Sequence, residues 1–401
     1  MKILVVNYRD RMHPAAGGAE KHLHRIFSKI VEMGHEVVLF TTMFPGAKVR
    51  EVVDGIQVVR NGGDLLFQLT VALNLKKLDR EFNFDVVVED LNKLPVFAHW
   101  FVRKPLLVQM HHLWRKSIFS EAFFPIAFGV WFFERVIPLF YRTQNFVVVS
   151  PSTKKELAEI GVDESRISVI YNGSEMPAVA AQLNEGSCGE TAAQFRGDSC
   201  ESSENVPVQD NALKNARAPY FIWLSRVHRY KGIWTALDAF EKFSKSHPEV
   251  KLYVVGGGPL LKKLPAWIKA HGLEGKVELT GFVPAARKYE LLSSSLALLQ
   301  TSYKEGWGLT VMEAAQLCKT TIASDVPGLR DSVRDGETGI LFPSGDAAAC
   351  ASAMEKIYDD AEWRANLGRN AKRYALTFSW EKSACETLEL LERTVEGSVR
   401  K

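Results

Sequence analysis

The chain has 401 residues, of which 46% are hydrophobic and 24% are charged, with 50 Lys and Arg residues against 47 Asp and Glu residues. This composition is ordinary for a folded protein and excludes a mainly disordered chain, while the length predicts two domains. A formal net charge of +3 is too small to indicate nucleic-acid binding through bulk electrostatics, so no nucleic-acid partner is expected.

No membrane-spanning segment is expected. The charge-free apolar stretch at 122–133 contains Pro125 and falls well short of the roughly 20 residues that a spanning helix needs. The first seven residues resemble a short strand rather than a signal peptide. Five cysteines without CxxC spacing argue against a zinc site or a disulfide framework, and they favour a cytoplasmic location.

Short apolar segments alternate with amphipathic helical patterns along both halves of the chain. The strands predicted in the first half are 3–7, 37–41, 85–90, 106–110, 146–150 and 167–172. Those predicted in the second half are 220–225, 251–256, 277–281, 296–302, 320–325 and 339–342. Most are continuous apolar runs, as in parallel strands covered on both faces. The pattern therefore predicts two Rossmann-like, doubly wound α/β domains.

A polar, acidic segment separates the two halves. Residues 177–216 carry 2 Lys and Arg residues against 6 Asp and Glu residues, whereas 1–176 carry 22 against 19 and 217–401 carry 26 against 22. Such a segment buries too little apolar surface to offset its ordering entropy, which favours a flexible insertion over a small ordered subdomain. We predict domains at 1–176 and 217–375, and a C-terminal helix at 376–401 that packs on the first domain.

Several familiar nucleotide-binding motifs are absent from the sequence. It contains no GxxxxGK[ST] loop, and the glycine run that starts at Gly256 has Leu261 where a dinucleotide fingerprint needs its third glycine. It also contains no Asp-x-Asp pair that could hold a divalent metal against phosphates. A dinucleotide oxidoreductase and a metal-dependent sugar transferase are therefore both disfavoured.

Two motifs at predicted strand ends could bind an anion. Gly17 and Gly18 precede a helix, where exposed backbone N–H groups and the helix dipole favour negative charge, although such a pair is often only structural. Arg226 and Lys231 follow the first strand of the second half and could contact phosphate oxygens. The alternative for these two is a solvated basic loop.

The third motif places two glutamates eight residues apart around a glycine-containing turn. Glu305 is expected in a loop and Glu313 about one turn into the following helix, with Gly308 between them. Their carboxylates could accept hydrogen bonds from ribose or sugar hydroxyls, whereas the alternative is a capped helix with solvated glutamates.

In this order, the three motifs resemble the family 4 retaining glycosyltransferases (group 1 glycosyltransferases) of GT-B architecture. Further matching segments are 109–112, 148–152, 169–173, 254–259, 279–283, 323–328 and 335–341. The match covers nearly the whole chain outside 177–216 and is strongest from 220 to 345. Trp307 and Tyr171 depart from the usual pattern, in which Phe and Pro are commoner, without affecting the chemistry.

The resemblance implies two Rossmann-like domains facing a central cleft, with an acceptor-side domain first and a nucleotide-sugar-binding domain second. It implies metal-independent transfer of a hexosyl-type sugar from a nucleotide diphosphate sugar, with no cofactor and no metal. Retention would proceed by same-face attack, in which the departing phosphate accepts the proton of the acceptor. The acceptor would be a glycan or a lipid-linked molecule in surface polysaccharide or glycolipid assembly. A nucleotide-sugar epimerase and a non-catalytic, transferase-like binding subunit are the alternatives.

The resemblance also implies roles for single residues. Arg226 and Lys231 would neutralise the departing diphosphate, Glu305 would bind the sugar hydroxyls, and His111 or its neighbour His112 would lie near the reacting sugar carbon. The residues expected to be catalytic are His111, Glu305, Arg226 and Lys231. Those expected to bind substrate are Gly17, Gly18, His112, Asn172, Gly256, Gly308, Leu309, Thr310 and Glu313, with Gly18, Gly308 and Leu309 on phosphate and Glu313 on ribose.

The acceptor side is less readable from sequence. Residues 93–142 interleave basic residues such as Lys93 and Lys116 with aromatic residues such as Trp100 and Phe124. This pattern favours peripheral contact with an anionic membrane on the cytoplasmic side, where a lipid-linked acceptor would be found. The alternative is a set of buried helices with ordinary surface charges.

Overall fold

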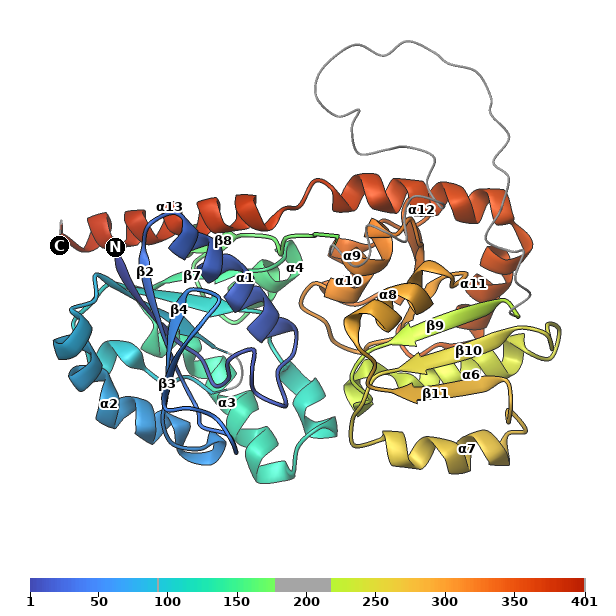
Figure 1. The fold of residues 1–401 in the computed structure, drawn as a ribbon, viewed down its shortest axis with the longest axis horizontal. Helices are drawn as coiled ribbons and strands as arrows, with labels where there is room; N and C mark the ends of the chain where they lie inside the picture. Colours follow the sequence, from blue (N-terminus) through green and yellow to red (C-terminus); the bar gives the residue numbers. More distant parts are fainter. Residues whose placement is uncertain (92–93, 177–217, 400–401) are drawn as a thin grey trace, which may run out of the picture. The chain divides into compact units, whose positions relative to one another are not determined.

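The computed structural model describes residues 1–91, 94–176 and 218–399, so the predicted insertion at 177–216 lies outside the described residues. The chain divides into two compact units, which we call unit 1 (Met1–Gly173 with Phe378–Lys401) and unit 2 (Ser174–Thr377) (Figure 1). Each unit is a parallel-sheet α/β domain, which confirms the predicted fold class. The central cleft concerns the placement of one unit against the other and stays a prediction.

Unit 1 contains, in its described residues, an eight-stranded sheet of order β3-β4-β2-β1-β5-β6-β7-β8. Its strands are β1 (Lys2–Val6), β2 (Glu36–Thr41), β3 (Arg50–Val53), β4 (Ile56–Arg60), β5 (Val86–Asp90), β6 (Leu106–Met110), β7 (Asn145–Val148) and β8 (Ile167–Val169). The described strands pair in parallel except for the β3–β4 hairpin, which has no counterpart among the predicted strands. Arg50 and Glu51 in β3 and Gln57 in β4 are polar, so the hairpin lacks the continuous apolar run of a buried strand.

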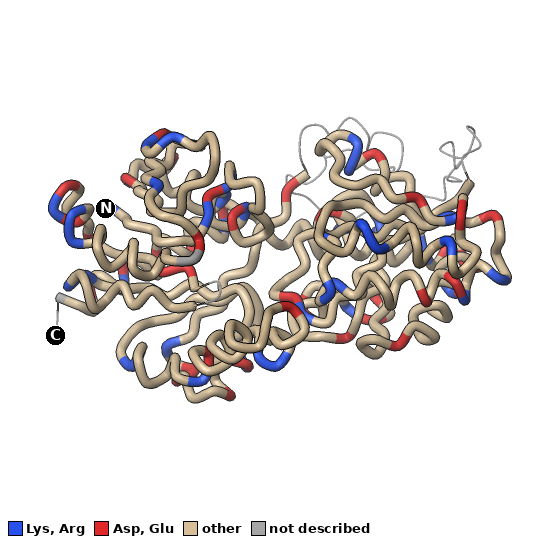
Figure 2. Tube along the Cα trace, turned by 90° about the horizontal axis from the view of Figure 1, so that it is seen from below, with Lys and Arg blue, Asp and Glu red and all other residues tan. Residues whose placement is uncertain are grey.

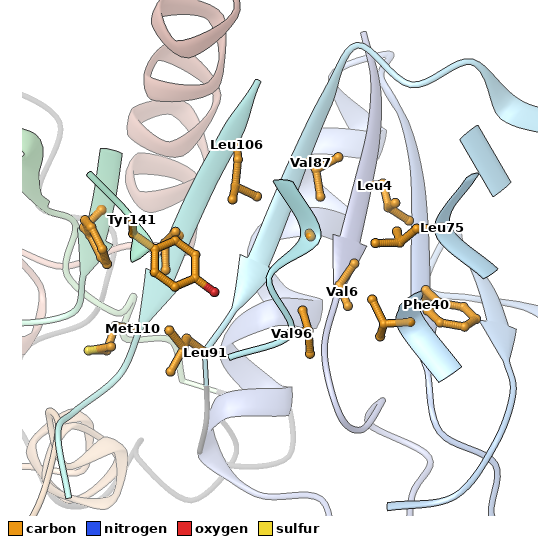
Figure 3. Close-up of a cluster of buried hydrophobic side chains, with 14 of the residues drawn as sticks. Leu4, Val6, Phe40, Leu75, Val87, Leu91, Val96, Leu106, Met110 and Tyr141 are labelled. Atoms are coloured by element: carbon orange, nitrogen blue, oxygen red, sulfur yellow. The ribbon is translucent and has the colours of Figure 1, made fainter. Parts of the chain in front are cut away.

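Helices cover both faces of this sheet (Figure 1). They are α1 (Gly18–Glu32), α2 (Phe67–Phe82), α3 (Phe124–Phe140), α4 (Pro151–Glu159) and α13 (Trp380–Val399). α1 packs against α13 on one face, and α2 and α3 lie on the other. Leu4 and Val6 point to the second face and join Leu75 of α2 in the core (Figure 3). Because both faces are covered, the central strands are mainly apolar.

The C-terminal helix α13 is held to unit 1 by specific contacts. Lys29 of α1 forms an ion pair with Glu381, and the Ser383 hydroxyl donates to the Tyr171 carbonyl at 2.6 Å. A Cβ on Gly173 would lie 2.3 Å from the Trp380 backbone nitrogen, so only glycine allows this approach.

Unit 2 contains, in its described residues, a six-stranded parallel sheet of order β11-β10-β9-β12-β13-β14. Its strands are β9 (Tyr220–Leu224), β10 (Lys251–Val255), β11 (Val277–Gly281), β12 (Leu298–Gln300), β13 (Thr321–Ser324) and β14 (Gly339–Phe342). Its helices are α6 (Ile233–Phe243), α7 (Leu264–Ala270), α8 (Ala285–Ser293), α9 (Leu309–Gln316), α10 (Leu329–Ser332), α11 (Ala347–Asp359) and α12 (Ala361–Ala375). Helix α6 packs against α11, and α9 packs against α12.

In both sheets the strand order reverses beside the first strand of the unit. The chain leaves β1 toward β2 and returns on the other side as β5; it likewise leaves β9 toward β10 and returns as β12. Open α/β sheets bind ligands outside the carboxyl ends of the strands at such a reversal. The residues that follow β1, β5, β9 and β12 are therefore the first places to look for a site.

Three further findings bear on the expectations from sequence. Among the described residues, no helix has both the length and the apolar character needed to cross a membrane. Acidic and basic residues are interspersed over both units, in keeping with the small net charge (Figure 2). Cys350 and Cys385 are free thiols, whereas Cys318 is disulfide-bonded; the sequence argued against a disulfide framework and did not predict a bond at this residue.

Candidate active site

The loop that follows β9 carries the predicted phosphate-binding residues Arg226 and Lys231. Gly232 has a φ of +68°, and a Cβ there would lie 1.9 Å from the Thr301 carbonyl oxygen. The Thr301 hydroxyl donates to the Gly232 carbonyl at 2.8 Å, which fixes the loop against the end of β12. Gly232 therefore allows the close approach that brings Lys231 to the neighbouring strand end.

Lys231 and Glu305 form a largely buried ion pair. The Lys231 Nζ lies 2.5 Å from Glu305 Oε2, and the two side chains are only 11% and 16% exposed. Burial acts to lower the pKa of Lys231, but the Glu305 carboxylate outweighs it, so this pKa is raised above its ordinary value. The side chain is thus a fixed ammonium that a ligand could contact at a strand end. The structure brings together these two residues, which sequence placed 74 positions apart.

Arg226 belongs to the same loop but keeps its side chain exposed. Its Nη2 donates to the Tyr230 hydroxyl at 2.9 Å, and Lys231 Nζ lies 5.0 Å from the centre of the Tyr230 ring. Tyr230 therefore contacts both cations of the motif. An exposed guanidinium that is already oriented can fork onto an anionic ligand at small entropic cost.

The glutamate loop is also held by packing. Trp307 is 2% exposed and anchors the loop in the interior of unit 2. A Cβ on Gly328 would lie 2.4 Å from the Glu305 carbonyl oxygen, so the loop after β13 packs directly on this backbone. Gly308, with a φ of +84°, is the N-cap of α9, which begins at Leu309. The carboxylate of Glu305 is thereby held in place.

Glu313 lies on α9 and contacts a cation that was not predicted. Its Oε2 accepts from Lys288 Nζ of α8 at 2.9 Å, and its Oε1 lies 3.4 Å from the Tyr289 hydroxyl. Thr310, predicted to bind substrate, accepts a hydrogen bond from Gln300 Nε2 at 3.0 Å. The candidate-site residues of unit 2 thus include two ion pairs, Lys231–Glu305 and Lys288–Glu313.

Gly256 has a structural reason to be glycine. Its φ is +132°, and a Cβ would lie 1.9 Å from the Ser225 carbonyl oxygen. Its backbone N–H donates to the Gly281 carbonyl at 2.8 Å. Close packing of the loops after β9 and β10 accounts for this glycine, and its contact with substrate stays a prediction.

In unit 1, His111 pairs with a buried carboxylate. It follows β6, and its Nε2 lies 3.2 Å from Oδ1 and 3.3 Å from Oδ2 of Asp90, the last residue of β5. Burial acts to lower the pKa of His111, but the charge and hydrogen bond of Asp90 outweigh it, so the pKa is raised. A raised pKa favours the imidazolium, which can donate a hydrogen bond.

His22 of α1 lies beside this pair in the opposite protonation state. Its Nδ1 is 2.5 Å from Asn172 Oδ1, and its ring meets the His111 ring edge-on with centroids 4.9 Å apart. Burial and the nearby His111 lower the pKa of His22 to about 3. The cluster thus places His22, whose pKa is lowered, next to His111, whose pKa is raised, and the predicted residue Asn172 fixes His22.

The glycine pair of unit 1 opens α1 as predicted. Gly17 is the N-cap, and its N–H donates to Glu20 Oε2 at 2.6 Å in a capping box. The helix start therefore contacts a carboxylate of its own chain, which meets the preference of this position for negative charge. Contact of Gly17 and Gly18 with phosphate stays a prediction.

His111 and His112 have different surroundings. The His112 ring meets Trp114 edge-on at 5.0 Å, whereas His111 contacts Asp90 and His22. Of the two, His111 therefore belongs to the charged cluster at the strand ends. Its position supports the choice of His111 as the candidate catalytic histidine.

Three residues of these clusters were not predicted: Asp90, His22 and Lys288. Asp90 carried a readable signal, because it ends a predicted buried strand at the edge where ligands bind. His22 adjoins the apolar helical face of Leu23 and Ile26, which gave no chemical hint. Lys288 lies in an ordinary helix between other polar residues, so only the fold brings it to Glu313.

Each unit thus has its own arrangement of charge. Unit 2 offers an exposed guanidinium and two fixed ammonium–carboxylate pairs, which suit a ligand that carries both phosphates and hydroxyls. Unit 1 offers one histidine with a raised pKa, His111, and one with a lowered pKa, His22. Among the described residues, no group of three or more His, Cys, Asp and Glu side chains could hold a metal ion.

Comparison with known proteins gives matches to both halves. Residues 208–374 match the family model described as Glycosyl transferases group 1, and residues 16–175 match the model described as Glycosyltransferase Family 4. A similar curated protein is the D-inositol 3-phosphate glycosyltransferase of Paenarthrobacter aurescens (strain TC1), 30% identical over 196 residues. That alignment covers 47% of this chain and 48% of the relative, so the matched region spans about half the length of that protein.

Solved structures match over almost the whole chain. Sucrose-phosphate synthase of Thermosynechococcus elongatus is 20% identical, with a TM-score of 0.77 over 99% of each chain. Anabaena HepE, solved in complex with UDP and glucose, is also 20% identical, with a TM-score of 0.72 over 98% of this chain and 99% of that one. At these identities the likeness establishes the GT-B fold alone.

Proposed function

This chain belongs to the family 4 (group 1) glycosyltransferases, and from that premise we propose that it transfers a hexosyl-type sugar from a nucleotide diphosphate sugar to an acceptor. The observation that carries the proposal is the Lys231–Glu305 ion pair beside Arg226 at the strand reversal of unit 2. A diphosphate sugar presents phosphate charge next to sugar hydroxyls. In this cluster the cations of Lys231 and Arg226 match the phosphates, and the Glu305 carboxylate matches the sugar hydroxyls.

Lys231 and Arg226 are proposed to contact the diphosphate. Charge builds on this group as the bond to the sugar breaks, and cations already in place stabilise that change without reorganising. The loop glycines and buried Trp307 keep the position of Glu305 fixed, which favours hydrogen bonds from its carboxylate to the transferred sugar. Backbone N–H groups of Gly308 and Leu309 are proposed to add contacts to phosphate.

Glu313 is proposed to accept hydrogen bonds from the ribose of the donor. Its oxygens already face Lys288 and Tyr289, so a ribose would share the carboxylate with these two groups. A carboxylate accepts through two oxygens, each with more than one lone pair, and can serve both partners. The pairing with Lys288 therefore fixes Glu313 without exhausting its capacity.

His111 is proposed to donate a hydrogen bond to the transferred sugar near its reacting carbon. The Asp90 pairing favours the protonated imidazole of His111, and His22 adds no second charge because it stays neutral. We propose retention by attack on the same face as the leaving group. The glycosidic oxygen–carbon bond to phosphate breaks, the acceptor oxygen bonds to that carbon, and the departing phosphate takes the acceptor proton. This step needs no metal and no cofactor.

The acceptor is proposed to be a glycan or a lipid-linked molecule in surface polysaccharide or glycolipid assembly. We place the protein in the cytoplasm with peripheral contact to an anionic membrane. The mixed basic and aromatic character of residues 94–142 supports this part of the proposal.

The test is donor turnover by the purified chain in chelator-treated buffer, after a thermal-shift panel of UDP-, GDP- and ADP-sugars has selected the donor. We expect one nucleotide series to raise the melting temperature, and acceptor-dependent release of the nucleotide diphosphate. NMR of the product should show the anomeric configuration of the donor. Inversion would contradict the mechanism, and isomerised donor without any acceptor would indicate an epimerase instead.

A further inference from the structure

Helix α3 presents large apolar side chains away from its own unit. Its inner face carries Ala127, Val130 and Ile137, which are buried. The opposite side carries Phe124, Phe128, Phe132 and Leu139, all exposed, at the spacing of successive helical turns. We call Phe124, Phe128 and Phe132, together with Phe119 and Phe123 just before the helix, the aromatic face.

The aromatic face is a continuous strip rather than a set of scattered residues. Phe123 and Phe124 are 77% and 66% exposed, and Phe128 is 47% exposed. The rings of Phe124 and Phe128 stack with centroids 6.2 Å apart, as do those of Phe128 and Phe132. Contiguous apolar surface of this kind marks a site of interaction, because water solvates it poorly.

Basic side chains border this strip. Lys116, Arg135 and Arg142 are exposed, and the Arg135 guanidinium lies 4.3 Å from the centre of the Trp131 ring. Glu134 points inward instead, where its oxygens accept from the backbone N–H groups of Trp114 and Arg115 at 2.5 and 2.7 Å. Glu121, close to Phe123 in the chain, is partly buried, so the exposed charges named here are positive. Lys93, which sequence grouped with these cations, lies outside the described residues.

We propose that the aromatic face of α3 lies in the surface of a bilayer that contains anionic lipids. A helix of 17 residues is about 25 Å long, and with the Ala127, Val130 and Ile137 side buried against its own unit it can lie along the surface but not cross it. Aromatic rings enter the interfacial region of a bilayer, while bordering Lys and Arg side chains reach lipid phosphates.

Charge complementarity favours a lipid surface over a second copy of the chain. A twofold contact would place the same positive border against itself, and like charges repel across such an interface. An anionic membrane supplies the missing negative charge. A lipid-linked acceptor would be met at this surface, and this link to the acceptor rests on the proposed function. The membrane contact itself is argued from the exposed rings and the charges around them.

The test is flotation of the full chain with vesicles of phosphatidylcholine alone or with added phosphatidylglycerol. The variants are Phe128→Ser/Phe132→Ser on the aromatic face and Lys116→Glu/Arg135→Glu on its border. The control is Leu69→Ser/Leu73→Ser, which removes exposed leucines from α2 of the same unit. All are surface changes, and unchanged melting temperatures would show that each variant is folded.

We expect wild type and the α2 control to float with the anionic vesicles, and each aromatic or basic double variant to bind about tenfold or more weakly. Equal binding by Phe128→Ser/Phe132→Ser, or no binding by wild type, would overturn the proposal. The proposal would also be overturned if light scattering showed that wild type is a dimer and that Phe128→Ser/Phe132→Ser is a monomer, because the aromatic face would then be a contact between two copies of the chain. Thermal shift by the donor nucleotide, which involves none of these residues, reports on the proposed function separately.

Discussion

The candidate-site residues of the two units hold their charges in contrasting ways. In unit 2 the acidic and basic groups form ion pairs, Lys231–Glu305 and Lys288–Glu313, which join separate loops and helices. In unit 1 one buried carboxylate, Asp90, sets the charge of His111 while the adjacent His22 stays neutral. The first arrangement provides fixed charge for a strongly anionic ligand. The second arrangement provides a proton on the His111 imidazole, which Asp90 orients.

This difference suggests how the proposed work is divided. A fixed charge in unit 2 should be insensitive to pH near neutrality, because Lys231 has its pKa raised. Unit 1 should be the pH-sensitive unit, since imidazoles titrate in that range. Changes in unit 2 should therefore alter donor binding and turnover at every pH, whereas changes in unit 1 should alter pH dependence.

The largest effect is expected from Lys231→Ala. Lys231 is proposed to stabilise the negative charge that develops on the departing diphosphate, and the loss of one such cation should lower kcat about 10²–10³-fold. The control is Lys251→Ala, which breaks an exposed ion pair with Glu278 in the same unit and should leave turnover near wild type. Steady-state release of nucleotide diphosphate measures both. Turnover of Lys231→Ala within about threefold of wild type would end the assignment.

The next effect is on acid stability, through His22. In the folded chain its pKa is about 3, so below the unfolded value of 6.5 the unfolded chain binds a proton that the folded chain does not. Stability is therefore lost as pH falls, by about 2 kcal/mol between pH 7 and pH 5. In urea unfolding, the free energy of unfolding of His22→Asn should therefore fall by about 2 kcal/mol less than that of wild type between pH 7 and pH 5. His271→Asn, a change at an exposed residue of unit 2, should match wild type. Equal pH slopes for His22→Asn and wild type would show that His22 is not buried neutral.

A smaller effect is expected from Asp90→Asn. Without the carboxylate, burial dominates and the pKa of His111 should fall below 6.5, which NMR of the imidazole would report. In wild type the charge of His111, and the stability it contributes, are lost as pH rises through its raised pKa. The variant should lose about tenfold in turnover at pH 7, less at pH 5. Asp85→Asn, next to the other end of β5, is the control, and an unshifted pH profile would refute the role of Asp90.

The smallest effect is expected from Glu313→Ala. The loss of hydrogen bonds to ribose should raise the KM for the donor by about tenfold or less and leave kcat nearly unchanged. The reason is that Glu313 would contact the ribose equally in the bound donor and in the transition state. Glu290→Ala on α8 removes an exposed partner of Arg287 and serves as the matched control. A fall in kcat with unchanged KM would place Glu313 nearer the reacting bond than proposed.

The strands of both sheets were largely predictable, because parallel strands buried on two faces are continuous apolar runs. The β3–β4 hairpin was missed, since Arg50, Glu51 and Gln57 interrupt that pattern in this edge pair. Motif spacing located Lys231 and Glu305, but their pairing depends on Gly232 packing against Thr301, a contact that only the fold reveals. Lys288 and His22 gave no local signal, because their roles come from partners 25 and 150 residues away.

Titration calorimetry of the preferred nucleoside diphosphate against its monophosphate tests the central claim most directly. If the unit 2 cluster binds the diphosphate, wild type should bind the diphosphate about tenfold or more tightly than the monophosphate, and Lys231→Ala should remove most of that difference. An equal preference in Lys231→Ala and wild type, or no preference in wild type, would contradict the claim.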